Sequence, residues 1–383
     1  MPALPDFRLE TYFSRWEFAA RYNLTASDAQ TMSLAELLEL ADDDGRARWE
    51  SLHLGYTETY GLPALREAIA GGYQHAAAED VLCFAGAEEA IYLAMQVLLG
   101  PGDHAVVVTP NYQAAETVPL SICEVTGVAL RPEEGWTLDL DAVEAALRPA
   151  TRVVSVNFPH NPTGAVPDEE TWRGLVRLCD ERGIRLFSDE VYRGLELSPR
   201  RPLPQAADLS PAAVSLNVMS KAYGLPGLRI GWIACRDRAL LRRLEHAKHY
   251  TSICSSAPSE ILALIALRAR DRILGRNRRI IADNRPVFDA FFSRFPGRFD
   301  WEPPQGGCVC FPRYLGPDGV EAMCADLVEQ EGILLLPASV NRSALTRTPA
   351  DRFRVGVGRL GSQEALDHWA AWLDKRRSPA RSP

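Results

Sequence analysis

The sequence predicts an α/β fold with a mainly parallel sheet, followed by a smaller α+β region. From about residue 52 to residue 262, helical patterns alternate with short apolar runs that are bounded by turn residues. Such runs are typical of parallel strands, because helices cover both faces of the sheet and no strand position meets water. After residue 295 the order changes to strand, helix, strand and helix. The pattern therefore separates a large sheet domain from a smaller C-terminal one.

The elements of the large region can be placed in order along the chain. Helical periodicity and apolar runs predict helices at 63–75, 88–99, 112–122, 140–147 and 168–182, and strands at 104–109, 152–157, 184–189, 213–218 and 229–235. A long helix rich in basic residues is expected at 270–295. In sheets of this kind, ligands bind at the carboxyl ends of the strands. Polar residues that directly follow a strand are therefore the first candidates for a site.

The chain divides into four predicted parts. The helical segment "LETYFSRWEFAARY" near the N-terminus is expected to pack with the C-terminal domain or with another subunit. The parts are an N-terminal arm belonging to the small domain (1–48), a large domain (49–283), a C-terminal small domain (284–374) and a disordered basic tail (375–383).

Composition narrows the class of partner. A net charge of −8 over 383 residues disfavours nucleic-acid binding, which needs a basic surface to neutralise phosphates. The eight cysteines form no CxxC pair and have no histidine at a zinc-site spacing, so reduced thiols and no metal are expected. No window approaches the ~18 apolar residues of a membrane span, and no secretory leader is seen. We expect a cytoplasmic protein with a small-molecule partner.

Two cations stand out in the stretch "NVMSKAYGLPGLRIGW". Lys221 directly follows a predicted strand, where burial would lower the pKa of its amine and make it a nucleophile. Arg229 opens the next apolar run, and a guanidinium suits a phosphate or a carboxylate. Taken alone, Lys221 is better interpreted as a solvated loop charge. Residues at the ends of other predicted strands are needed to distinguish the two interpretations.

Three other strand ends carry suitable groups. "VNFPHNPTGAV" supplies Asn161, whose amide can hydrogen-bond a ligand oxygen. "FSDEVYRG" supplies Asp189 and Tyr192, although an acid there could also cap a helix. The stretch "CFAGAEEAIYLAM" predicts a strand, followed by Gly86 to Glu88 and then by a helix. This order aims backbone N–H groups and the helix dipole at a phosphate.

The motifs together resemble one family. "AGAEEAI", "TPNY", "NFPHNPTG", "SDEVYRG", "SKAYGLPGLRIGW", "PQGGCVCF" and "FRVGVG" occur in the order typical of class I/II aminotransferases, fold-type I enzymes that depend on pyridoxal 5′-phosphate (PLP). The resemblance runs from about residue 50 to residue 370. It implies a large PLP-binding domain with a mainly parallel seven-stranded sheet. The small α+β domain would then combine the N-terminal arm with the C-terminal segment.

The resemblance also implies a role for each motif residue. Lys221 would form a Schiff base with PLP and move protons, Asp189 would pair with the pyridine nitrogen, and Tyr192 would hydrogen-bond the ring hydroxyl together with Asn161. Tyr112 would stack on the ring, unless it is a core tyrosine. The remaining cofactor contacts implied are Gly86, Ala87, Glu88, Ser220 and Arg229 around the phosphate.

Two further residues have implied roles. Tyr56 in "LGYTETYG" matches a tyrosine that reaches the cofactor phosphate of the neighbouring subunit, which implies a homodimer with active sites at the interface. Arg354 in "RFRVGVG" matches the family's clamp for the substrate α-carboxylate, with Asn161 beside it. The flanking Arg352 and Arg359 are expected to be surface charges.

Three positions depart from the family pattern. Val218 stands where relatives commonly carry a phosphate-binding hydroxyl, and "NLTASDAQTMSL" replaces a Gly-x-Pro segment that closes over the substrate. Asn341 stands where an apolar residue is frequent. We expect all three changes to bear on how the ligands are held.

The resemblance does not fix the reaction. Amino transfer from an L-amino acid to a 2-oxo acid is the main prediction; the alternative is a lyase or cyclase acting by β/γ-elimination or replacement. The cofactor-binding stretches are also similar to those of capreomycidine synthase, which dehydrates and cyclises a hydroxyarginine. Such a substrate would need acids for its guanidinium, and Glu10, Glu17 and Asp28 are candidates unless they are surface charges.

Two other function classes are disfavoured. A PLP-fold regulator fused to a DNA-binding domain would need a helix-turn-helix segment, which is not seen before the core. A nicotinamide-dependent dehydrogenase would need G-x-G-x-x-G after the first strand, and "YGLPGLRIG" has the wrong spacing.

Overall fold

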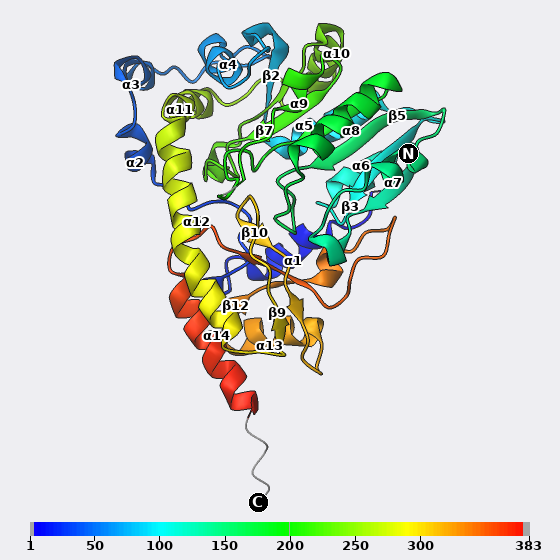
Figure 1. Ribbon diagram of the computed structural model, residues 1–383. Coiled ribbons are helices and arrows are strands. Elements are labelled where there is room, and N and C mark those ends of the chain that lie inside the picture. The colour runs from blue at the N-terminus through cyan, green and yellow to red at the C-terminus, as the bar shows by residue number, and fades with distance from the viewer. Residues whose placement is uncertain (1–3, 199, 378–383) are drawn as a thin grey trace, which may run out of the picture.

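The computed structural model describes residues 4–198 and 200–377, with Arg377 described by its backbone alone (Figure 1). Its large domain is built on a seven-stranded sheet with the order β2-β8-β7-β6-β5-β3-β4. All neighbours are parallel except β8, which is antiparallel to both β2 and β7. The strands are β2 (Val81–Phe84), β3 (His104–Thr109), β4 (Glu124–Ala129), β5 (Thr151–Asn157), β6 (Arg185–Asp189), β7 (Val214–Val218) and β8 (Gly231–Ala234).

Helices cover both faces of this sheet, as the continuous apolar strand runs predicted. Leu82 and Phe84 of β2 face one cluster, whereas Val81 and Cys83 face the other, because successive side chains of a strand point to opposite sides. One face is covered by α5 (Ala87–Leu98), α6 (Ala114–Leu120) and α10 (Arg238–Lys248). The other is covered by α4 (Pro63–Ala70), α7 (Leu140–Ala146), α8 (Glu169–Glu181), α9 (Ala206–Leu209) and α11 (Ala257–Arg268).

The second domain joins both ends of the chain. β1 (Tyr22–Asn23) pairs in parallel with β12 (Ile333–Leu334), so the N-terminal arm extends the C-terminal segment. Small antiparallel sheets and two helices complete the domain. They are β10 (Val309–Cys310), β13 (Leu336–Pro337) and β14 (Phe353–Gly356), then β9 (Phe299–Asp300) and β11 (Arg313–Tyr314), and the helices α13 (Val320–Gln330) and α14 (Ser362–Arg377).

Three more helices belong to the N-terminal part, and one long helix connects the domains. α1 (Arg8–Trp16) lies between the two domains, since Arg8 donates from its N–H to Gln113 and from its side chain to the Val340 carbonyl. α2 (Leu34–Leu38) and α3 (Asp43–Glu50) follow. α12 (Arg270–Ser293) runs from the large domain to the small one (Figure 1).

Two predicted boundaries differ from the structure. The division expected between residues 283 and 284 falls inside α12, because one continuous helix serves both domains. The tail expected at 375–383 begins too early, since 375–377 form the last turn of α14 and 378–383 lie outside the described residues. The assignment of residues to domains stays a prediction. Within the described ranges, no helix is both long and apolar enough to cross a membrane.

Candidate active site

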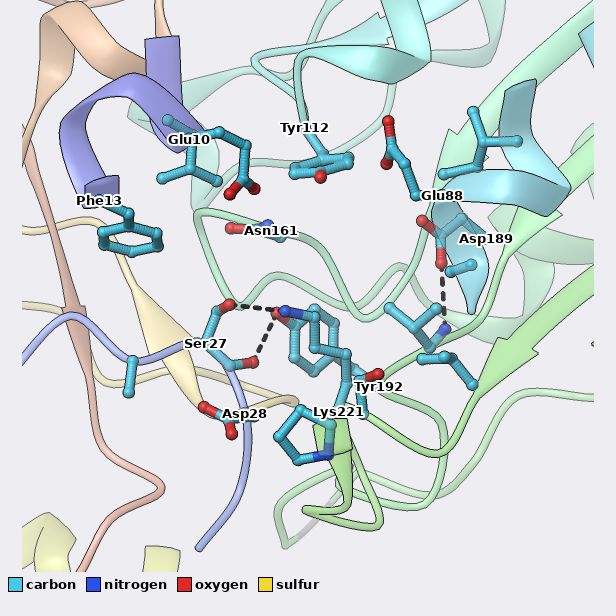
Figure 2. A pocket seen from close by; sticks show the side chains of 18 of the residues that line it. Glu10, Phe13, Ser27, Asp28, Glu88, Tyr112, Asn161, Asp189, Tyr192 and Lys221 are labelled. Atoms are coloured by element: carbon cyan, nitrogen blue, oxygen red, sulfur yellow. Dashed lines mark hydrogen bonds between the residues drawn. The ribbon is translucent and has the colours of Figure 1, made fainter. Parts of the chain in front are cut away.

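A cavity of about 730 Å³ opens at the carboxyl ends of the sheet strands (Figure 2). The ends of β5, β6 and β7 contribute Asn157, Asp189 and Val218, and the start of α5 contributes Ala87 and Glu88. Helix α1 supplies the opposite wall. The cavity thus lies where parallel sheets bind ligands, and both domains line it.

Lys221 projects into this cavity from the turn that follows β7. Burial lowers the pKa of its amine, with Asp28 acting in the opposite direction. The Nζ atom donates a 2.8 Å hydrogen bond to the hydroxyl of Ser27. A lowered pKa increases the share of neutral amine, which is the nucleophilic form.

Asp189 ends β6, beside the end of β5. The N–H of Val191 donates to its carboxylate over 3.1 Å, and Asn157 donates to its backbone carbonyl over 3.0 Å. Burial raises the pKa of the Asp189 carboxyl to about 7. A cation brought next to this carboxyl would stabilise its ionised form, so a protonated ring nitrogen fits the position.

Tyr192 and Asn161 lie on the same side of the cavity as Lys221. The Tyr192 hydroxyl donates to the Ser27 carbonyl over 2.8 Å. The backbone N–H of Asn161 donates to the Asn157 side chain, which fixes the turn that presents the Asn161 amide. Both side chains line the cavity, as expected for groups that contact a ring substituent.

Tyr112 forms another wall, and Glu88 lies next to it (Figure 2). Burial raises the pKa of the Tyr112 hydroxyl, and the neighbouring Glu88 raises it further. Burial also raises the pKa of Glu88, whose hydrogen bond with Tyr112 opposes that change. The ring of Phe7 packs 5.2 Å from the Tyr112 ring. Tyr112 is therefore a partly buried wall residue with one side toward the cavity.

The start of α5 has the properties of an anion site. Gly86 precedes the helix with φ 95°, a conformation that favours glycine. A Cβ atom at this position would come within 2.5 Å of the Arg229 guanidinium. Arg229 donates weakly to Ser220 over 3.5 Å, and no carboxylate of the described chain pairs with it. A guanidinium beside the positive end of a helix dipole fits a phosphate group.

Arg354 is fully buried and is not among the residues that line the cavity, although it contacts the lining residue Asn161. It donates to the Thr25 carbonyl over 2.9 Å, to the Thr25 hydroxyl over 3.3 Å and to the Asn161 amide oxygen over 3.4 Å. Within the part of the chain that the structure describes, no carboxylate lies at ion-pair distance from Arg354. A buried guanidinium without an acid can receive a substrate carboxylate.

The expectation for the two neighbouring arginines was wrong. Arg359 lines the cavity and forms a 2.7 Å ion pair with Asp28. Arg352 is buried, stacks over the Trp136 ring at 4.7 Å and donates to the Phe311 carbonyl. Arg352 is covered because the 131–136 turn folds over it, whereas Arg359 stays about one-third exposed (32%) and is held by Asp28 of the N-terminal arm. No local pattern reveals these contacts.

The atypical positions differ in their relation to the cavity. Val218 lines it with methyl groups, whereas Asn341 is buried outside the cavity wall. Tyr56 is 91% exposed and does not line the cavity of its own chain. Ser27 and Phe13 do line it and were missed by the sequence reasoning. The departure from Gly-x-Pro was the only signal that pointed to the segment of Ser27.

The three candidate acids, Glu10, Glu17 and Asp28, line the same cavity. Asp28 is paired with Arg359, whereas Glu10 and Glu17 have no ion pair among the residues that the structure describes. Burial raises the pKa of Glu17, and the charges of Glu10 and Asp28 raise it further. Glu10 and Glu17 therefore make the wall at α1 and its C-terminal end acidic, and a cationic ligand there would favour the ionised form of Glu17.

Comparison with known proteins identifies the family. The model of the aminotransferase class I and II family matches residues 22–373. The chain belongs to this family. Members of this aminotransferase family use PLP, which confirms the predicted cofactor, and the chain is a PLP-dependent enzyme of this family.

Individual relatives cover nearly the whole chain. Capreomycidine synthase from Streptomyces vinaceus is 30% identical over 356 residues, which span 92% of this chain and 90% of the relative. The structure of a PLP-dependent aminotransferase from Streptococcus suis 89-1591 superposes with a TM-score of 0.91 at 28% identity, covering 99% and 100% of the two chains. The PLP-dependent cyclase OrfR superposes with a TM-score of 0.87 at 26% identity, covering 98% and 99%.

Proposed function

We propose that this enzyme acts on an L-amino acid with a cationic side chain and transfers its amino group to a 2-oxo acid. The observation that carries the proposal is the distribution of charge around the cavity. Lys221, Glu10 and Glu17 line the cavity, and the buried guanidinium of Arg354 contacts Asn161 of the cavity wall. Among the described residues, neither the two acids nor Arg354 has an ion-pair partner. An amino acid that carries an α-carboxylate and a side-chain cation complements both kinds of charge.

The residues around Lys221 fit the cofactor in a defined arrangement. Arg229, Ser220 and the N–H groups of Ala87 and Glu88 would hold the phosphate. Asp189 would hold the ring nitrogen, Tyr192 and Asn161 the ring hydroxyl, and Tyr112 one ring face. Gly86 has no side chain and would therefore leave room for the phosphate and for Arg229. When bound, PLP supplies an electron sink for bond changes at the substrate α-carbon.

The proton chemistry is assigned to Lys221. Burial lowers the pKa of this amine and so favours its neutral form, in which Nζ would accept a proton from the substrate α-carbon and return it at a neighbouring atom. Asp189, held by the Val191 N–H, would keep its negative charge next to a protonated ring nitrogen. The segment around Ser27 and α1 lines the cavity opposite these groups and would limit access of water to them once a substrate is bound.

Substrate orientation follows from the two charged ends. Arg354 and the Asn161 amide would bind the α-carboxylate, while Glu10 and Glu17 would receive the side-chain cation. Arg359 does not compete for a carboxylate, because Asp28 already neutralises it at 2.7 Å. The aromatic ring of Phe13 lines the cavity on the same helix, where it can pack against the aliphatic part of the substrate.

Cyclisation of a hydroxylated guanidino amino acid is the second candidate. It is favoured by the similarity to capreomycidine synthase over 92% of the chain and by the likeness to the PLP-dependent cyclase OrfR. Such a reaction expels the hydroxyl group as water and closes a ring through a side-chain nitrogen, with the amino group retained. The acidic wall at α1 would bind this substrate as well, so the two reactions can be distinguished only by their products.

We infer a homodimer from large apolar side chains that are exposed on two connected segments. Leu54, Tyr56 and Tyr250 are more than 80% exposed, and Ile253 is 50% exposed. Thr57 donates to the Ser255 carbonyl, so the two segments lie next to each other. A second copy of the chain would cover these side chains, and Tyr56 would reach the partner's phosphate site. Co-expression of Lys221→Ala with Tyr56→Phe tests this, because mixed dimers would regain one site with both residues intact.

The test of function uses the protein saturated with PLP. Arginine, ornithine and lysine are compared with citrulline, which has nearly the shape of arginine without its charge, and with a hydroxyarginine. Mass analysis of products distinguishes the candidates: a 2-oxo acid with matched amination of the acceptor supports transfer, whereas loss of water with the amino group retained supports cyclisation. Equal turnover of citrulline and arginine would refute the cationic substrate class.

A further inference from the structure

The segment Leu24–Thr31, called here the strap, is hydrogen-bonded to both domains. The strap receives a 2.7 Å hydrogen bond from the Gly356 N–H at the Leu24 carbonyl and donates from Ala29 to the Lys221 carbonyl over 3.1 Å. Its Gln30 N–H donates to the Gly358 carbonyl over 2.8 Å. The strap thus ties the lysine turn of the large domain to the region after β14 of the small domain.

Ser27 lies at the centre of the strap and contacts two of the proposed catalytic residues (Figure 2). Its hydroxyl accepts from Lys221 Nζ over 2.8 Å, and its carbonyl accepts from the Tyr192 hydroxyl over 2.8 Å. The thiol of Cys308 donates to the same carbonyl over 3.3 Å. One residue therefore holds the end of the lysine and the end of the tyrosine at once.

The strap backbone has little room to move. Gly224, with φ 68°, passes so close that a Cβ on it would lie 2.6 Å from the Gln30 carbonyl oxygen. Arg276 donates to the Gln30 carbonyl over 2.8 Å and to the Thr31 carbonyl over 3.0 Å. These contacts hold the part of the strap that follows Ser27 in the sequence. They thereby fix the position from which Ser27 reaches Lys221.

We propose that Ser27 is a positioning residue for Lys221, and that its hydroxyl orients the lysine amine and stabilises the charged form of this amine. Lysine has four rotatable side-chain bonds, so a fixed acceptor at 2.8 Å restricts the direction of its Nζ atom. A hydroxyl that accepts from an ammonium group favours that group over the neutral amine. The strap therefore counteracts the effect of burial on Lys221. The inference rests on the proposed role of Lys221 as the reactive amine.

The test measures Lys221 directly in the cofactor-free protein. An amine-selective acylating reagent is applied at a series of pH values, and the labelled Lys221 peptide is quantified by mass spectrometry. In Ser27→Ala the labelling midpoint should move down by about one pH unit, because the charged amine has lost its acceptor. Ser27→Thr keeps the hydroxyl and should restore the midpoint.

A matched control distinguishes the effect of losing the Ser27 hydroxyl from the effect of a general disturbance of the strap. Gln30→Ala removes the hydrogen bond from the Leu360 N–H without touching Lys221 or Tyr192, and its midpoint should equal that of the wild type. The charged and titratable groups around Lys221 stay in place in every variant: Glu17, Asp28, Glu88, Asp189, Cys308 and Arg354. A shift in Ser27→Ala is then attributable to the hydroxyl.

Several outcomes would overturn the proposal. An unchanged midpoint in Ser27→Ala would do so, and so would an equal shift in Gln30→Ala, which would indicate general loosening of the strap. If Ser27→Ala does not fold, Ser27→Cys serves instead, because sulfur is a weak acceptor of similar size. Loss of the expected cofactor absorbance in the wild type, with a normal labelling pattern, would refute the proposed function and leave the role of Ser27 intact.

Discussion

The two ends of the cavity differ in how they are built. At the proposed cofactor end, Asp189 is the last residue of β6, and Lys221 and the start of α5 follow β7 and β2 of the same sheet. Short motifs place all three. At the proposed substrate end, α1 and the strap come from the N-terminal arm, and the strap contacts Arg354 and Arg359 from the far end of the chain. The cofactor end thus follows from the fold of one domain, whereas the substrate end depends on the packing of two. Variants at the two ends should therefore fail in different ways.

The largest effect is expected from Lys221→Ala at the cofactor end. Loss of the amine removes both the covalent attachment of the cofactor and the proton carrier, so turnover should fall by at least about a thousandfold. The visible absorbance band that sodium borohydride abolishes in the wild type should be missing. A variant that keeps both the band and the turnover would contradict the assignment of the cofactor end.

Asp189→Asn should reduce turnover by roughly a thousandfold, because the ring nitrogen loses its counter-charge. The cofactor-free protein provides an independent measurement. Because burial raises the pKa of Asp189 to about 7, its contribution to folding is fully present below its unfolded pKa near 4 and is lost as the pH rises through 7.

The stability of Asp189→Asn relative to the wild type should therefore increase between pH 4 and pH 8. The change is at most about 4 kcal/mol in the free energy of unfolding. Denaturant unfolding of the two cofactor-free proteins at several pH values checks this, since other buried acids are common to both. A pH-independent difference would be inconsistent with a raised pKa.

At the substrate end, Arg354→Met should lower kcat/KM by about a hundredfold, mainly through KM, because the α-carboxylate loses its partner. Cofactor absorbance should persist. Arg352→Met is the matched control: Arg352 lies two positions away, stacked on Trp136 outside the cavity. It should lower the melting temperature with little change in KM. Similar KM values for both variants would refute the carboxylate assignment.

The smallest effect is expected at Glu17, which directly follows α1. Glu17→Gln should reduce the preference for arginine over citrulline by about tenfold, since one carboxylate of the acidic wall is neutralised. The measurement is the ratio of kcat/KM values for the two amino acids. Glu36→Gln, which alters the capping box of α2 and does not line the cavity, should leave the ratio unchanged.

Part of this structure was predictable from short stretches of sequence. β3 lies at the predicted residues 104–109, and β5, β6 and β7 begin within one residue of their predicted starts. Their apolar runs are long enough to mark buried strands, and the groups at their ends are then placed by geometry alone. The family and the cofactor follow from these local motifs.

Other features could not be read from local patterns. Ser27 and Lys221 are 194 residues apart, and Asp28 and Arg359 are 331 residues apart. Arg352 and Arg359 looked like surface charges because their covering partners lie in distant segments. Likewise, the acids of α1 became cavity residues only through the position of that helix between the domains.

The sequence alone therefore predicted five of the seven strands by range, the family and the cofactor, because each depends on neighbours along the chain. The strand β4 (Glu124–Ala129), at the edge of the sheet, was missed. The tertiary structure decided the charge of the substrate end and the contact of Ser27 with Lys221. The physical reason is that these features arise where the N-terminal arm pairs with β12 and passes between the domains. Hydrogen bonds across such distances are set by the packed fold, which no short sequence window contains.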